Sequence, residues 1–453
     1  MVSNHPMLEQ VTIILVLFTF VAVGLSARLR HETTVVAFST KRNSISAFVT
    51  AAGVSMTFVG GAALVNMASL GYTFGWYTLV DPISAFIGIF IATLLVGNFR
   101  KDNGVTMAEL LSSNYPPLAF LIGTITSTVF LLITAAQFVA FSKLLSPFFP
   151  GIDPKLMMLF PALVVSVYVF AGGFYAVTRT DVLQLMFVLI CLLLPMAILV
   201  LNGVSEYPGE HIRHSNAFTQ MPLNLMILLS ISILYIPVSQ DMNIRAKSAA
   251  THRTAVIGFI SGAALYVLIV FVSIYMGITL NHQGVALGDP ESAFSYFFKT
   301  YFPAWGILPI IAGMAAIWST LDTYLMNTMT SIAEDVLRRT AVARNASDRT
   351  LLVVAGGLTF GLAMLIAIFF FTILTLVLSA LLIYISVLIP VALGRRFKLH
   401  DRVILYATLV VIVVIVTSEV LKLSVNPKAL IYPAFGAAVM GSLRLFTRLR
   451  SLS

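Results

Sequence analysis

Apolar stretches of about 20 residues recur along the whole chain, and they limit its fold more than any other feature. Each stretch is long enough to cross a hydrocarbon core of about 30 Å as an α-helix. Of the 453 residues, 59% are hydrophobic and 10% are charged, whereas soluble domains carry about 25% charged residues. The even alternation of a transmembrane barrel is missing from the sequence. The sequence therefore predicts an all-α, polytopic membrane protein that lies in the lipid bilayer.

We predict thirteen transmembrane helices in a single transmembrane domain over residues 1–453. The expected ranges are 8–27, 45–71, 76–98, 117–147, 156–175, 180–202, 222–241, 254–278, 306–334, 351–371, 373–394, 403–421 and 429–443. The first range has the length of a signal peptide, but residues 1–7 contain no Lys or Arg. We therefore expect it to be a retained helix.

Basic residues are unevenly distributed among the segments that join these helices. The net charge of +9 is a balance also found in nucleic-acid-binding proteins. If the N-terminus lies outside, however, 21 of the 27 Lys and Arg residues fall on the cytoplasmic side, as the positive-inside rule requires. We therefore expect no nucleic-acid partner. We expect an integral plasma membrane protein of a bacterial inner membrane, with its N-terminus outside and its C-terminus cytoplasmic.

Two of the predicted helices contain residues that interrupt a helix. The range 45–71 includes Gly60 and Gly61 beside hydroxyl residues, and the range 222–241 includes Pro237. Taken singly, these are explained by close packing through small residues and by a proline kink. Together they lie five helices apart, at the start of two consecutive blocks of five. Paired interruptions at matching positions indicate an inverted-repeat transporter.

The inverted-repeat interpretation divides the single domain into four parts. These are a leading helix at 8–27, a first repeat at 45–202, a second repeat at 222–394 and two trailing helices within 403–443.

Four acidic residues fall inside predicted helices, where a charge costs at least about 2.5–3.5 kcal/mol at the bilayer centre. Asp81 and Glu419 lie near outer ends, within reach of water. Asp181 begins the sixth helix, where the helix dipole favours a carboxylate. Asp322 lies near the middle of the ninth helix and has no such explanation. We therefore expect a functional role for Asp322.

The residues around Asp322 predict an ion site. On a helix, Ala316, Ser319, Thr320 and Thr323 share one face through their three- and four-residue spacings. This face offers hydroxyl oxygens beside a carboxylate, and hard cations prefer oxygen ligands. Hydroxyls that bond back to the preceding turn are the alternative, which does not account for the carboxylate.

Four segments, in order along the chain, are similar to motifs of the sodium:solute symporter family. The most specific is Gly172–Gln184, with the sequence GGFYAVTRTDVLQ. Ala315–Thr323, AAIWSTLDT, is similar to a second motif, and Ser55–Gly61 resembles the first core helix of the family. Gln240–Ala250, which contains Arg245, resembles the intracellular loop after the sixth core helix. The resemblance implies two inverted repeats with an extra leading helix.

The resemblance also implies sodium as the transported ion, with a main sodium site between the first and eighth core helices. Matched by motif, the ligands are the carbonyls of Thr50, Gly53 and Ala316 and the hydroxyls of Ser319 and Thr320. The family usually has a larger apolar residue at the position of Gly53. Since only the carbonyl of that residue binds, the site is still implied.

Some members of the family hold a second sodium with the aspartate of the first motif. Here the resemblance implies Asp181, joined by Ser319, Asp322 and Thr323. Two carboxylates near one site need either a second cation or a proton on one of them. Sodium-coupled and proton-coupled symport therefore both stay open.

Solute contacts are predicted at positions that face the two interruptions. These are Thr57, Gln137, Phe138, Tyr235 and Gln240. Tyr235 falls where sugar-transporting members have an aromatic gate, and an aromatic packed in the bundle is the alternative. No basic residue is expected at the midplane to bind a carboxylate. Amino acids, sugars, vitamins and small carboxylates are all used by the family, and the sequence does not choose among these small-molecule solutes.

The combined prediction is sodium-coupled symport of a small organic solute by alternating access. A membrane solute sensor with the same fold is the alternative, and concentrative uptake would separate the two. An enzyme is not expected, because the predicted helices offer no nucleophile–base pair and the single cysteine, Cys191, excludes a thiolate metal site. A channel is disfavoured, because one chain has no ring symmetry.

Overall fold

A computed structural model of the chain describes residues 6–26, 34–101, 103–112, 115–202, 218–302, 307–422 and 425–450. Within these ranges the chain is helical and has no β-strand, with one isolated bridge between Ile45 and Ala249. The same ranges hold ten helical segments long and apolar enough to cross a bilayer. They become eleven if the bent pair Leu223–Val238 and Gln240–Ser248 is one span. The predicted all-α, polytopic fold class is confirmed.

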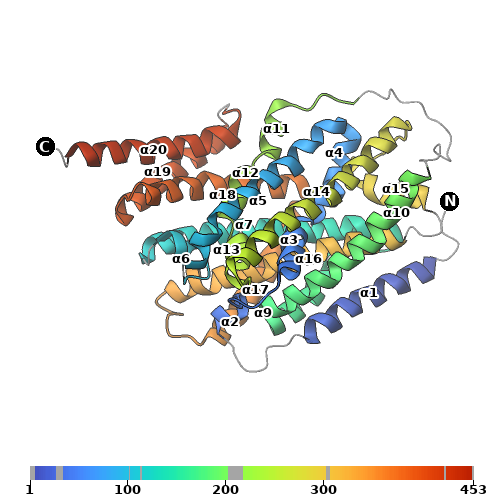
Figure 1. Cartoon of the computed structure of the whole chain (residues 1–453), viewed down its shortest axis with the longest axis horizontal. Helices are drawn as coiled ribbons and strands as arrows, with labels where there is room; N and C mark the ends of the chain where they lie inside the picture. Colours follow the sequence, from blue (N-terminus) through green and yellow to red (C-terminus); the bar gives the residue numbers. More distant parts are fainter. Residues whose placement is uncertain are drawn as a thin grey trace.

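The helices differ widely in length, and short 3-10 or π-helical turns join several of them (Figure 1). The first half of the chain contains α1 (Pro6–Ser26), α2 (Val35–Ser39), α3 (Ala47–Phe58), α4 (Met67–Phe74), α5 (Val80–Lys101), α6 (Met107–Ser112), α7 (Pro116–Leu145), α8 (Pro154–Met157), α9 (Leu159–Val188) and α10 (Leu194–Leu201). The second half contains α11 (Leu223–Leu229), α12 (Ser232–Tyr235), α13 (Gln240–Ser248), α14 (His252–His282), α15 (Ala293–Tyr301), α16 (Ile307–Ser331), α17 (Asp348–Phe369), α18 (Ile373–Arg396), α19 (Asp401–Val420) and α20 (Lys428–Arg450).

Two continuous helical segments each cover residues that we predicted to belong to two separate membrane helices. Ala63–Lys101 includes the predicted helix 76–98 and the end of the helix before it. Pro154–Leu201 includes the predicted helix 156–175 and all but the last residue of the predicted helix 180–202. The polar residues between these ranges form no separate loop, because they are part of the helical segments. The count of thirteen separate helices is therefore not confirmed.

Glycines with positive φ break both long segments. Gly75 (φ 61°, ψ −137°) follows α4, and Gly173 (φ 48°, ψ −139°) lies inside α9. Residues with a side chain rarely adopt this conformation. At Gly173, a Cβ atom would also lie 2.3 Å from the carbonyl oxygen of Phe38. Because the break precedes the predicted loop at 176–179, Asp181 lies about two helical turns beyond it.

The two interruptions predicted from the sequence are present. Helix α3 ends at Phe58, and Val59 has non-helical angles (φ −81°, ψ 69°) before the π-helical turn η1 (Ala62–Asn66). Helix α12 continues through the 3-10 turn η5 (Ile236–Val238) to Ser239, which is extended (φ −74°, ψ 144°). The chain then enters α13 with a bend of 41°. Both helices therefore expose backbone groups inside the bundle.

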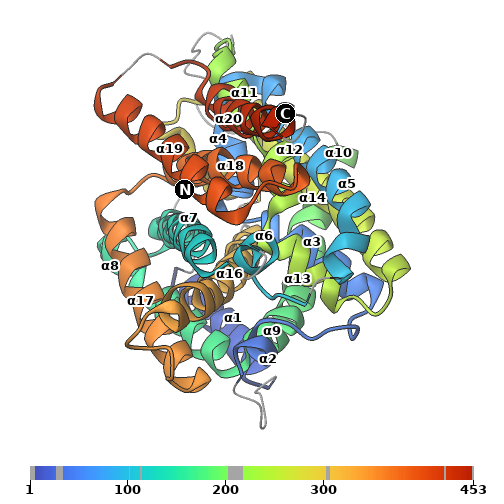
Figure 2. The same ribbon diagram turned by 90° about the vertical axis from the view of Figure 1, so that its left-hand side faces the viewer.

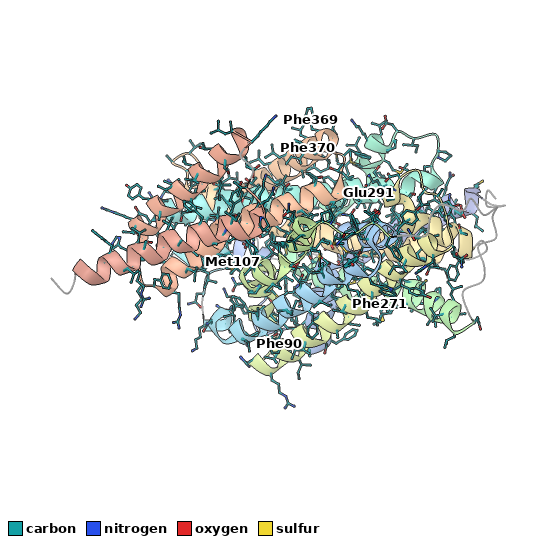
Figure 3. The ribbon with its side chains drawn as sticks, turned by 90° about the horizontal axis from the view of Figure 1, so that it is seen from above. Phe90, Met107, Phe271, Glu291, Phe369 and Phe370 are labelled. Atoms are coloured by element: carbon teal, nitrogen blue, oxygen red, sulfur yellow. The ribbon has the colours of Figure 1, made fainter. Side chains whose placement is uncertain are left out.

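Helix α16 lies at the centre of the bundle, with α3, α7 and α9 packed around it (Figure 2). Every residue of α16 from Pro309 to Ser331 is buried. The outer helices expose large apolar side chains instead, among them Phe90, Phe271, Phe369 and Phe370 (Figure 3). Helices that are apolar on their outer faces as well as their inner ones suit a lipid environment.

Candidate ion and solute site

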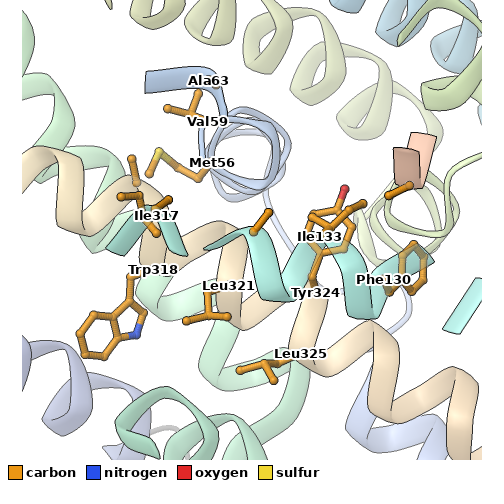
Figure 4. Close-up of a cluster of buried hydrophobic side chains, with 14 of the residues drawn as sticks. Met56, Val59, Ala63, Phe130, Ile133, Ile317, Trp318, Leu321, Tyr324 and Leu325 are labelled. Carbon is orange, nitrogen blue, oxygen red and sulfur yellow. The ribbon is translucent and has the colours of Figure 1, made fainter. Parts of the chain in front are cut away.

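Helices α3 and α16 meet at the interruption of α3. The Thr320 hydroxyl of α16 donates a hydrogen bond to the Met56 carbonyl (3.1 Å), and the Ala316 carbonyl of its own helix lies 3.4 Å away. Carbonyls in the last turn of a helix lack partners within that helix. Gly60 permits the approach, since a Cβ atom there would lie 2.6 Å from Thr320 Oγ1. In Figure 4, Met56 and Ile317 lie side by side where the two helices meet.

Thr50 and Gly53 lie on α3, before the interruption. The Thr50 side chain faces α14, because a Cβ atom on Gly258 would lie 2.5 Å from Thr50 Cβ. Its hydroxyl donates to the Ser46 carbonyl (2.9 Å). The role predicted for Thr50 uses only its carbonyl, so this orientation of the side chain is compatible with it.

Asp181 is completely buried and has partners on two other helices. The Ser319 hydroxyl of α16 donates to Asp181 Oδ1. The Nη2 atom of Arg245, from α13, donates to Asp181 Oδ2 at 3.1 Å. Two of the four residues predicted for the second cation site are thus in direct contact.

Asp322 is also completely buried, and one of its oxygens accepts two hydrogen bonds. Tyr168 donates to Oδ2 at 2.6 Å, and Thr180 donates to the same atom at 2.9 Å. The Trp318 indole in turn donates to the Tyr168 hydroxyl at 2.6 Å. The other oxygen, Oδ1, has no hydrogen-bond partner among the residues that the structure describes. Asp322 therefore has one saturated oxygen and one oxygen free to accept a donor or a cation.

Arg245 is the residue whose placement the sequence failed to predict. We expected it in an intracellular loop, yet its side chain is 3% exposed and pairs with Asp181. The Nη2 atom also donates to the hydroxyl oxygens of Thr57 (2.6 Å) and Thr323 (3.4 Å). A buried arginine beside Asp181 was not expected from the sequence. The bend before α13 turns that helix inward, and all nine of its residues are buried, which a count of basic residues cannot reveal.

A cavity lies beside the contact between α3 and α16. Three of the predicted solute contacts, Thr57, Gln137 and Tyr235, line it, and so does Thr320. Most of the remaining wall is aliphatic. The Gln137 side chain accepts a hydrogen bond from the Gly61 amide (2.8 Å), so it joins α7 to the interrupted segment.

The other two predicted solute contacts lie outside the wall of this cavity. Gln240 is buried, and its Oε1 atom is within hydrogen-bond distance of the Met107 amide and the Ser331 hydroxyl (3.3 Å each). Phe138 is buried in the hydrophobic core.

Asp81, which we expected to reach water, also lines the cavity. Its Oδ2 atom accepts a hydrogen bond from the Tyr266 hydroxyl (3.0 Å). Two further tyrosines of the wall, Tyr235 and Tyr324, are joined by a hydrogen bond of 2.9 Å between their hydroxyls. The signal that could have identified Asp81 was present, because an acidic residue inside a membrane helix is a functional candidate by default.

Curated relatives of the chain are named as symporters. "Sodium/proline symporter 2" of Staphylococcus saprophyticus is 24% identical over 321 residues, which are 64% of this chain and 61% of that protein. A "Sodium/proline symporter" of Staphylococcus aureus is 25% identical over 319 residues, with the same two shares. The matched part of the chain thus spans about three fifths of the length of these relatives.

Solved structures of transporters share the fold. A Na+-coupled sialic acid symporter in a substrate-bound, outward-open state has a TM-score of 0.68 at 17% identity, covering 97% of this chain and 98% of that chain. Mhp1, a nucleobase-cation-symport-1 family transporter in a closed conformation, has a TM-score of 0.58 at 15% identity, covering 90% and 93%. The profile of the sodium:solute symporter family matches residues 38–391. The chain belongs to the sodium:solute symporter family.

Proposed function

We propose that the chain is a secondary active transporter that carries a small organic solute together with sodium by alternating access. One observation carries the proposal. Thr320 lines the solute cavity and also donates to the Met56 carbonyl at the interruption of α3. A cation bound at this contact would therefore act on a wall of the cavity. Coupling of this kind is a reciprocal free energy, typically about 1–3 kcal/mol between two ligands.

The sodium ligands that we propose are those implied by the family motifs. The carbonyls of Thr50 and Gly53 come from α3, and Ala316, Ser319 and Thr320 come from α16. Interrupted helices supply such sites in transporters through backbone carbonyls, and Thr50 and Gly53 belong to the helix that ends at this interruption. The hydroxyl of Thr320, now bonded to Met56, would turn to the ion when sodium binds.

The proposed cycle follows from this position. Sodium from the outside would hold α3 against α16, and the solute would then bind better in the completed cavity. Closure and inward opening would then release sodium and the solute to the inside. The two ligands can drive this change only through the difference between their affinities for the two conformations.

The wall of the cavity supports a solute with an apolar body and a group that donates hydrogen bonds. Its polar residues include the Asp81 carboxylate, and no basic residue is found among the described residues that line it. An ammonium or secondary amine would pair with Asp81, while Thr57 and Gln137 would bind further polar atoms. The names of the two relatives cite proline, which contains such an amine.

We also propose that the N-terminus lies outside and the C-terminus in the cytoplasm. In Figure 1, α1 begins at one end of the bundle and α20 ends at the opposite end. This arrangement supports an odd number of crossings. The excess of basic residues in the segments assigned to the cytoplasm supports the direction.

The function is tested by uptake into proteoliposomes. Thermal-shift screening of a solute library, with and without sodium, would first select an amine-containing solute. An inward sodium gradient should then drive concentrative uptake of that solute in radiolabelled form. Uptake driven equally well by a proton gradient without sodium would favour proton coupling. Binding of the solute without any concentrative uptake would favour the sensor.

A further inference from the structure

We propose that the guanidinium of Arg245 is the resident counter-ion of Asp181, so that sodium binds only at the contact between α3 and α16 and not at Asp181. The inference rests on the proposed sodium-coupled function and specifies its number of ion sites. The family motifs imply a second cation at Asp181. In this proposal the side chain of Arg245 takes the place of that cation.

The burial of Arg245 is the first observation. Its side chain is 3% exposed and that of Asp181 is 0% exposed, with 3.1 Å between Nη2 and Oδ2. A buried charge is strongly destabilising without a partner. The acid of α13 itself, Asp241, accepts a hydrogen bond from Asn327, whereas the contact of Arg245 is with Asp181 of α9. Asp181 is therefore the direct partner of Arg245.

The oxygen atoms around Nη2 are the second observation. They are Asp181 Oδ2 at 3.1 Å, Thr57 Oγ1 at 2.6 Å and Thr323 Oγ1 at 3.4 Å. One carboxylate and two hydroxyl oxygens form the kind of ligand set that a hard monovalent cation would take. Asp181 and Thr323 both belong to the set implied for a second sodium. The nitrogen atom thus occupies the position between these oxygens that such an ion would need.

Gly53 is the third and independent observation. A Cβ atom on Gly53 would lie 1.7 Å from Arg245 Nη1 and 2.5 Å from its Cζ atom. No side chain fits there while the guanidinium is in place. The glycine and the arginine therefore form a matched pair. The space that the missing side chain leaves is filled by the resident cation.

Sodium binding to the purified protein tests this directly, with radiolabelled sodium counted per protein molecule. We expect Arg245→Gln to bind one sodium ion more than the unmodified protein, because the vacated space is bordered by Asp181, Thr57 and Thr323. The double variant Arg245→Gln with Asp181→Asn should return to the original number. Equal numbers in the unmodified protein and Arg245→Gln would overturn the proposal. A smaller number in the double variant than in the unmodified protein would overturn it too.

Gly53→Ala and chemical rescue keep the proposal testable if Arg245→Gln is poorly folded. Gly53→Ala should lower the melting temperature of the unmodified protein, and it should have a much smaller effect when Arg245 is already Ala. Added guanidinium ion should raise the melting temperature of Arg245→Ala but not that of Arg245→Ala with Asp181→Asn. Equal effects of Gly53→Ala in both backgrounds, or no rescue, would contradict the pairing. These assays need no uptake, so they remain informative if sodium-driven transport itself is not found.

Discussion

The Tyr168 hydroxyl donates a 2.6 Å hydrogen bond to Asp322 Oδ2, which joins α9 to α16 ahead of the Gly173 kink. Thr180, beyond the kink, donates to the same oxygen at 2.9 Å. One carboxylate oxygen therefore holds both arms of the bent helix against the central helix. Both donors lie within seven residues of Gly173. A change at Asp322 would therefore loosen α9 on both sides of its kink.

Asp322→Ala should be clearly less stable than Asp322→Asn. A hydrogen bond to a charged group contributes about 1.5–3 kcal/mol, and donors left buried without a partner cost further free energy. The asparagine retains an acceptor for Tyr168 or Thr180, whereas the alanine retains none. Thermal unfolding in detergent would measure the difference. Thr124→Ala is a control, because the Thr124 hydroxyl is exposed and bonds to the carbonyl of Phe120 in its own helix. Equal melting temperatures for the two Asp322 variants would show that these bonds do not hold the helices together.

Thr320→Ala and Ser319→Ala should both raise the sodium concentration that half-saturates uptake. Loss of one ligand oxygen worth about 1.4 kcal/mol corresponds to a roughly tenfold weaker ion affinity. Only Thr320 lines the cavity, so only its variant should also raise the KM for the solute at saturating sodium. Thr128→Ala is the matched control, since its hydroxyl bonds to the Thr124 carbonyl on an exposed face. Unchanged sodium dependence in both variants would remove these hydroxyls from the proposed site.

The sequence predicted those features of the fold that depend on residues close together in the chain. Apolar length identified the membrane helices, and Gly60, Gly61 and Pro237 identified both interruptions, because each of these residues alters backbone geometry where it stands. The bend at Gly173 was harder to predict. The polar residues after it suggest a loop, yet the helix continues through them. The positive φ of Gly173 and the close approach of Phe38 show why the glycine is required.

The site was predictable only in part, because some of its contacts depend on how distant helices pack. The hydroxyl face of Ser319 and Thr320 follows from helical spacing. Arg245 looked like an ordinary cytoplasmic arginine, since nothing near it in the sequence reveals that α13 turns into the bundle. Asp81 looked close to water for the same reason. Gly53 was noted as unusual for the family, but its meaning required the position of the Arg245 side chain.

Asp81→Asn should weaken binding of a solute that carries an amine and leave a neutral analogue of the same size little affected. A charge-assisted hydrogen bond is roughly twice as strong as a neutral one, so we expect about a tenfold loss for the amine. Tyr266→Phe removes the 3.0 Å partner of Asp81 but keeps the carboxylate, and it should have a smaller effect. Competition against a bound radiolabelled solute would measure both. A similar loss for the amine and the neutral analogue would show that the carboxylate does not select the charge.

Gly173→Ala should strongly reduce the amount of folded protein. The residue has φ 48°, and its Cβ atom would lie 2.3 Å from the Phe38 carbonyl oxygen, so both the backbone and the packing oppose a side chain. Gly357→Ala is the matched control, because Gly357 lies within α17 and a Cβ atom there would have no neighbour within 4 Å. Since alanine has the higher helix propensity, by roughly 1 kcal/mol, the control should be neutral or stabilising. Size-exclusion profiles and melting temperatures of the two variants would compare them. If Gly173→Ala were as stable as the control, the kink would not depend on glycine, and the position of Asp181 beyond it would need another explanation.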